Sequence, residues 1–100
     1  MDKIFLVYDE YCFDGIKENT IVIPCATFEI AKQVLKKKLE WYLKNTYINR
    51  FVDENLNFCK EYLDDCDVWN VEDDSVEIYI YCKDTRLDLH IAEEYIINTI

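Results

Sequence analysis

The chain has 100 residues, is 51% hydrophobic and 15% aromatic, contains one glycine and one proline, and carries a formal net charge of −10 at pH 7. This length and composition predict one folded domain over residues 1–100, with little material for linkers or disorder. Nucleic acid is excluded as a direct ligand, because so negative a chain repels phosphate at range.

No segment has the pattern of a signal peptide or a membrane span. Met1-Asp2-Lys3 leads directly into the first apolar stretch, and no apolar run approaches the ~20 residues of a transmembrane helix. We therefore expect a protein of the host-cell cytoplasm that has no membrane partner.

The N-terminal segment predicts a pair of strands. Lys3 to Tyr8 is a run of β-branched and aromatic residues that is typical of a buried strand. The only glycine follows in the turn sequence Asp14-Gly15, and a second strand is expected over Thr20 to Ile23. We expect Pro24 to end the pairing because it lacks a backbone donor. The two strands would then form a hairpin with a longish polar loop.

The strongest local signal is a long amphipathic helix that begins near Phe28. Thr27 is suited to cap its N-terminus, and Glu29 lies in the first turn, where negative charge is favourable. Apolar residues recur at helical spacing and mark the side to be buried: Ile30, Ala31, Val34, Leu35, Leu39, Tyr42 and Leu43. Charged residues recur at every fourth position on the exposed side: Lys32, Lys36, Glu40 and Lys44.

A second, shorter helix is predicted after an interruption at residues 49–53. Its apolar stripe is narrower and consists of Val52, Leu56, Cys59 and Leu63. Asp64, Asp65 and Asp67 should end it, because short acidic side chains compete for backbone hydrogen bonds.

Three further strands are predicted in the C-terminal third. Val68 to Val71 precedes an Asp73-Asp74 turn, and a strand of strict alternation follows. Its inward residues are Val76, Ile78, Ile80 and Cys82, and its outward residues are Glu77, Tyr79, Tyr81 and Lys83. After a connection at 83–86, Leu87, Leu89 and Ile91 point inward, and Asp88 and His90 point outward. The predicted fold is α+β, an antiparallel sheet of four to five strands packed on one face by one long and one shorter helix, in the order β-β-α-α-β-β-β.

The charge is concentrated in one half of the chain. Residues 1–52 contain 7 acidic and 8 basic residues, whereas residues 53–100 contain 14 acidic and 3 basic residues. Ten carboxylates lie between Asp53 and Glu77, where Lys60 is the single base. Such crowding opposes folding through repulsion, so we expect it to serve either binding or solubility.

Residues suited to catalysis are scarce, and we expect neither enzymatic activity nor a cofactor. His90 is the only histidine and Ser75 the only serine, and one glycine cannot build a phosphate-binding loop. The five cysteines include no Cys-x-x-Cys pair and indicate free thiols in a reducing cytosol. Carboxylate pairs such as Asp64-Asp65 lack the ligand pattern of a calcium loop. A metal-dependent enzyme that uses these aspartates is nevertheless kept as a third alternative, after the two hypotheses given below.

The acidic residues around the predicted turn suggest a mimic of nucleic acid. Alternate residues on a strand lie about 6.6–6.8 Å apart, which is comparable to the spacing of phosphates. A groove lined with lysine and arginine would attract such a surface at long range. Trp69 and the two tyrosines beside the charge could anchor a partner or cover a small core. The predicted partner-binding residues are Asp64, Asp65, Asp67, Glu72, Asp73, Asp74, Glu77, Tyr79 and Tyr81.

Two short motifs precede the predicted long helix. Val7-Tyr8-Asp9-Glu10-Tyr11 is followed by Phe13-Asp14-Gly15, and Thr27, Glu29 and Ala31-Lys32 open the helix. Over residues 1–45 this arrangement resembles small uncharacterised proteins of phages and mobile elements in low-GC bacteria. Proteins of that genomic type include anti-CRISPR and other anti-defence inhibitors, some of which resemble acidic DNA mimics. The resemblance implies a class of partner and no site residues.

These observations lead to one hypothesis and one main alternative. The hypothesis is an acidic inhibitor that blocks the nucleic-acid-binding groove of a basic partner protein. The expected partner is a bacterial defence nuclease, and a CRISPR effector is the preferred target. The alternative is a small non-catalytic interaction or regulatory protein whose acidity only maintains solubility. Both are compatible with a monomer or a homodimer.

Overall fold

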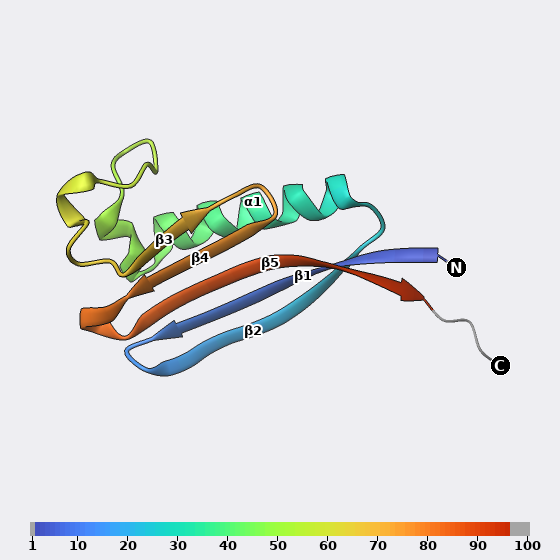
Figure 1. The fold of residues 1–100 in the computed structure, drawn as a ribbon, viewed down its shortest axis with the longest axis horizontal. Coiled ribbons are helices and arrows are strands. Elements are labelled where there is room, and N and C mark those ends of the chain that lie inside the picture. The colour runs from blue at the N-terminus through green and yellow to red at the C-terminus, as the bar shows by residue number, and fades with distance from the viewer. Residues whose placement is uncertain (1, 97–100) are drawn as a thin grey trace.

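Five antiparallel strands form one sheet, and an α-helix lies across one of its faces (Figure 1). The structure is a computed structural model that describes residues 2–96. The strands are β1 (Asp2–Phe13), β2 (Ile16–Cys25), β3 (Val68–Val71), β4 (Ser75–Ile80) and β5 (Thr85–Ile96), in the order β2-β1-β5-β4-β3. The helix α1 spans Phe28–Asn45. The α+β class and the antiparallel sheet are as predicted from the sequence.

The hairpin of β1 and β2 has a much tighter turn than the sequence predicted. β1 continues to Phe13 and β2 begins at Ile16, so only Asp14 and Gly15 connect the two strands. Both connecting residues have positive φ, 54° and 78°, which suits a two-residue turn between twisted strands. The expected long polar loop is wrong, because those polar residues pair across the two strands instead.

Pro24 does not end the pairing of the hairpin. It lies inside β2, opposite Leu6 of β1. β2 is an edge strand, where a residue without a backbone donor is tolerated. The expectation from the sequence was therefore wrong at this position.

Helix α1 forms where its cap and its apolar stripe predict it. The Thr27 hydroxyl oxygen accepts a hydrogen bond from the backbone N–H of Ile30 at 3.1 Å. The side that faces the sheet buries Ala31, Leu35, Tyr42 and Leu43. Ile30 was expected on this side but is 45% exposed, because the buried face is narrower than the apolar stripe.

The second helix predicted over residues 52–63 does not form. That part of the chain is an irregular loop, flanked and interrupted by 3-10 turns at Tyr47–Phe51 and Lys60–Tyr62. The Asp53 carboxylate accepts hydrogen bonds from the backbone N–H groups of Asn55 and Asn57, at 2.8 and 3.0 Å. This local turn competes with a helix for the same donors. Leu63, expected on the apolar stripe, is 63% exposed.

The two C-terminal strands also differ from their predicted limits. β4 ends at Ile80, and residues Tyr81–Lys83 form a 3-10 turn instead of continuing the strand. Cys82, expected in the core, is therefore exposed. β5 then crosses the middle of the sheet and pairs with both β1 and β4.

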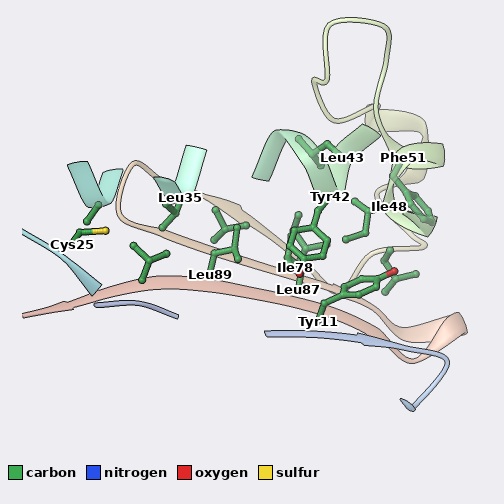
Figure 2. Close-up of a cluster of buried hydrophobic side chains, with 14 residues drawn as sticks. Tyr11, Cys25, Leu35, Tyr42, Leu43, Ile48, Phe51, Ile78, Leu87 and Leu89 are labelled. Atoms are coloured by element: carbon green, nitrogen blue, oxygen red, sulfur yellow. The ribbon is translucent and has the colours of Figure 1, made fainter. Parts of the chain in front are cut away.

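The two faces of the sheet have different roles. The side toward α1 contains the hydrophobic core (Figure 2), with Val7, Tyr11, Val76, Ile78, Ile80, Leu87 and Leu89 from the strands packed against the helix and the following turn. The opposite side, here named the open face, carries the alternate residues, and none of the described strand residues on it is fully buried. No helix formed by residues 2–96 has the length and apolar character to cross a membrane.

Candidate functional site

The acidic segment, defined as residues 53–77, is exposed throughout its charged positions. All ten of its carboxylates are solvent-exposed: Asp53, Glu54, Glu61, Asp64, Asp65, Asp67, Glu72, Asp73, Asp74 and Glu77. None of them lies within 4.0 Å of a basic nitrogen in the part of the chain that the structure describes. Their charge is therefore available to a partner.

Carboxylates outside this segment behave differently, because several are held in ion pairs within the fold. The pairs with lysine are Lys3–Glu93, Lys17–Glu10, Lys32–Glu29, Lys38–Asp9 and Lys83–Asp14, at 2.8 to 3.9 Å, and Asp88 contacts the His90 ring at 2.9 Å. All of these pairs join strands β1, β2 and β5, the helix and their connecting turns. The acidic segment thus contributes to the net charge without internal compensation.

Six predicted site residues lie at the two ends of the edge strand β3. Asp64, Asp65 and Asp67 precede the strand, and Glu72, Asp73 and Asp74 form the turn after it. Asp67 and Glu72, the residues on either side of the four residues of β3, are five strand positions and therefore about 16–17 Å apart. The fold therefore brings both triplets to one edge of the sheet, although not into one cluster.

The turn triplet also faces helix α1. Glu72 and Asp73 line a shallow groove of about 410 Å³ together with Lys32 and Lys36 of the helix. Neither lysine approaches these two carboxylates within ion-pair distance. The helix lysines are neighbours of the acidic turn without neutralising it.

Glu77 lies away from both triplets, on the open face of the sheet. It stands directly opposite Asp88 of β5, which in turn stands opposite Glu10 of β1. Three carboxylates thus form a row across three strands, an arrangement that destabilises a sheet by repulsion. Glu10 has the cationic partner Lys17 and Asp88 contacts the His90 ring, whereas Glu77 has no such partner among the described residues. The sequence analysis missed this row because it requires the strand register.

The predicted aromatic anchors are only partly available. Tyr81 is 72% exposed in the turn after β4. Tyr79 already has the Arg86 guanidinium over its ring at 4.8 Å and donates a hydrogen bond to Asp84. Trp69 stacks on Phe58 with ring centroids 4.5 Å apart and belongs to the margin of the core. Tyr81 is therefore the one predicted ring of the three that is free for a partner.

A buried polar network under α1 was not predicted from the sequence. Asp9 is 1% exposed, yet it lies in the middle of β1 on the side of the core. Its Oδ1 accepts a hydrogen bond from the Tyr42 hydroxyl at 2.6 Å, and that hydroxyl accepts one from the Asn19 amide at 2.8 Å. The Lys38 ammonium lies 3.0 Å from Oδ2 as an ion pair, in an orientation that makes no hydrogen bond.

This network changes the acidity of Tyr42. Burial, reinforced by the hydrogen bond to the Asp9 carboxylate, raises the pKa of the phenol well above its usual value. The hydroxyl therefore stays protonated and serves as a fixed donor to Asp9. A sequence signal did exist, since Asp9 interrupts an otherwise apolar inward series, but only the packing of α1 over β1 reveals the partners.

Chemically reactive groups do not converge in the described part of the chain. Among residues 2–96, no three histidine, cysteine, aspartate or glutamate side chains are placed to hold a metal ion. The five cysteines are free thiols, and burial raises the pKa of Cys66 to about 11. His90 stacks on Tyr8 at 4.6 Å and contacts Asp88.

Comparison with known proteins adds no assignment to this geometry. No protein-family model, no curated protein and no solved structure matches the chain.

Proposed function

We propose that this protein is a non-catalytic inhibitor that mimics nucleic acid and occupies the cationic groove of a nucleic-acid-binding protein. The observation that carries the proposal is the acidic segment, in which ten exposed carboxylates form no ion pair with a described residue. A basic groove meets them without first having to break an internal pair.

Free carboxylates favour association in two ways. Their summed field attracts a positive surface at a distance and raises the rate of encounter. At contact they replace phosphates as acceptors for lysine and arginine, whose planar guanidinium suits a carboxylate as well as a phosphate. Binding of this kind weakens steeply as salt increases.

The placement of the charge supports the same reading. Phosphates follow each strand of a duplex at about 3.4 Å along the axis, so the ~16–17 Å between the two triplets corresponds to about five phosphates. Asp67 and Glu72 bound this interval at the sheet edge. Tyr81, the exposed ring, is a candidate anchor at the far end of the neighbouring strand.

The sequence resemblance to proteins of phages and mobile elements selects the first partner to test. We propose a nuclease of bacterial defence, with a CRISPR effector as the preferred case. Such an enzyme holds its nucleic acids in a positively charged channel that a mimic can occupy.

The test is displacement of fluorescent DNA from a purified CRISPR effector, followed by fluorescence anisotropy. One variant neutralises four unpaired carboxylates by combining Glu72→Gln, Asp73→Asn, Asp74→Asn and Glu77→Gln. The matched control combines Glu10→Gln, Asp14→Asn, Glu29→Gln and Glu93→Gln, which neutralises the same number of carboxylates, each paired with a lysine. Both variants raise the net charge of −10 by four units.

We expect the first variant to lose at least tenfold in displacing potency and the control to change little. Equal losses in both variants would show that net charge alone matters. Unchanged displacement by the first variant would contradict mimicry by these residues.

One observation favours the alternative in which acidity has no specific partner. β3 is a short edge strand, and charges at both of its ends discourage pairing with the edge of another molecule. In that case the variant that lacks the unpaired carboxylates would displace DNA no differently from the unmodified protein. It would, however, self-associate. Analytical ultracentrifugation of the two four-fold variants separates this role from binding.

A further inference from the structure

A second surface feature lies on the other side of the molecule from β3. Between the β1–β2 hairpin and the C-terminal half of α1, the structure forms an open cleft of about 650 Å³. Five of the residues that line it are aromatic: Tyr11, Phe13, Trp41, Tyr42 and Tyr47. Two of them are labelled in Figure 2, Tyr11 on β1 and Tyr42 on α1. Their ring centroids are 5.1 Å apart and the ring planes are tilted by 43°.

A β-bulge gives this cleft its only charged lining residue. Tyr11 pairs with Asn19 and Cys12 pairs with Lys17, so Glu18 is an extra residue in β2. A bulge changes the direction of a side chain, and here both Glu18 and its neighbour Asn19 line the cleft. The Glu18 carboxylate makes no ion pair with a described residue.

Hydrogen bonds within the protein fix the polarity of the cleft. The Tyr42 hydroxyl donates to the Asp9 carboxylate, so its oxygen accepts from the amide NH2 of Asn19. Asn45 likewise donates its NH2 to the carbonyl of Trp41 at 3.0 Å. Both amides are thereby oriented, and each leaves its carbonyl oxygen, beside one remaining N–H, for a ligand. These two oxygens and the Glu18 carboxylate are hydrogen-bond acceptors at the cleft.

The aromatic rings of the cleft already attract cations of the protein itself. The guanidinium of Arg50 lies over the Tyr47 ring at 4.2 Å, and the ammonium of Lys83 lies 5.4 Å from the centre of Phe13. Trp41, the ring type that binds cations best, is 56% exposed and holds no cation of the described chain.

We propose that this cleft binds the guanidinium group of an arginine side chain presented by a basic protein partner. The planar cation would stack on Trp41 and donate to Glu18 and to the amide oxygen of Asn19. Guanidinium has donors only and stacks on aromatic faces, so it matches both the acceptors and the rings. The surrounding negative charge of the protein favours a cation and disfavours any phosphate-bearing ligand.

This site is independent of the acidic segment. β2 and β3 are the two opposite edges of the sheet, so the cleft and the triplets at β3 do not share residues. The arginine site can therefore fail while the mimic hypothesis stands, and the reverse also holds.

The test is titration of the intact protein with N-acetyl-arginine amide, monitored by the indole N–H signals in ¹H–¹⁵N NMR. The chain has two tryptophans, and Trp69 is an internal control because it stacks on Phe58 away from the cleft. We expect the Trp41 signal to shift to saturation while Trp69 stays in place. N-acetyl-citrulline amide, which has the same shape without the charge, should bind at least tenfold more weakly.

Variants separate local recognition from general attraction. Glu18→Gln should weaken binding of the arginine probe about tenfold, and Trp41→Leu by a similar factor. Binding to the Trp41→Leu variant is followed by the side-chain amide signals of Asn19 and Asn45, which also line the cleft. Glu61→Gln removes one exposed carboxylate from the acidic segment and should leave binding unchanged. The thermal unfolding midpoint of each variant shows that the fold is kept.

Three results of the arginine titrations would overturn the proposal. They are the absence of a Trp41 shift at high probe concentration, equal binding of the citrulline and arginine probes, and equal effects of Glu18→Gln and Glu61→Gln. A stronger response to adenosine than to the arginine probe would assign the cleft to a nucleobase and would likewise overturn it.

Discussion

The carboxylates of the acidic segment and the carboxylate of Asp9 lie in opposite environments. In residues 53–77 ten carboxylates lie in water with no described cationic partner, whereas Asp9 is buried between a lysine and a tyrosine. A carboxylate in water keeps its hydration and costs the fold little, while a buried one must be compensated by its neighbours. The first kind of charge can therefore serve an external partner, and the second kind serves the structure.

This contrast also explains why removal of charge should have different consequences in the two regions. Loss of a partner in the buried network leaves a desolvated ion, so stability should change strongly. Loss of charge in the acidic segment mainly relieves repulsion, so binding should change and stability should not. Four predictions, from the largest effect to the smallest, test this difference.

The largest effect is expected when Lys38 is replaced by methionine. Lys38→Met leaves the Asp9 carboxylate buried and without its cation, which should lower the free energy of unfolding by about 2–3 kcal/mol. Urea denaturation followed by circular dichroism measures the change. Lys37→Met is the control, because Lys37 is an exposed neighbour without an ion pair to a described residue. Equal stability of the two variants would mean that the buried pair contributes nothing.

A smaller loss is expected for Tyr42→Phe. This change removes the donor to Asp9 and the acceptor for Asn19, and should cost about 1–3 kcal/mol. Tyr81→Phe alters an exposed phenol and should cost almost nothing. If both variants unfold at the same urea concentration, the network is not a source of stability.

Alkaline pH should weaken the fold through groups that are held protonated. Burial raises the pKa of Cys66 to about 11 and raises that of Tyr42, whereas unfolded cysteine and tyrosine ionise near 9.0 and 10.0. The unfolded chain then loses protons first, so stability that is complete below pH 9 is lost as pH rises toward 11. The thermal midpoint measured from pH 7 to 11 should fall over this range. In Tyr42→Phe the decline above pH 10 should be shallower, and an identical decline would remove Tyr42 from the explanation.

The smallest effect on stability is expected from the two four-fold neutralised variants. Neutralising Glu72, Asp73, Asp74 and Glu77 should leave the free energy of unfolding unchanged or raise it by less than about 1 kcal/mol, because repulsion is relieved. The control that removes paired carboxylates should lose about 1 kcal/mol, since exposed ion pairs contribute little each. Urea denaturation at low salt measures both. Strong destabilisation of the first variant would show that the acidic segment has a structural role.

The sequence predicted those parts of the fold that depend on local signals. Thr27 and the apolar stripe after it were sufficient to place α1, because a cap and a helical periodicity act within a few residues. The inward alternation of Val76, Ile78 and Ile80 likewise identified β4. The prediction failed over residues 52–63, where the Asp53 carboxylate closes a turn that the apolar spacing does not reveal.

By itself, the sequence determined the concentration of charge, the α+β class and the exposure of the acidic segment, since short polar residues between apolar runs stay in water. Only the tertiary structure decided which charges are compensated. Asp9 meets Lys38 and Tyr42 across two elements, and Glu77 meets Asp88 through strand register, while Glu18 enters the cleft through a bulge. Each of these contacts depends on how segments that are distant in the sequence pack or pair. The spacing of residues along the chain does not predict such contacts.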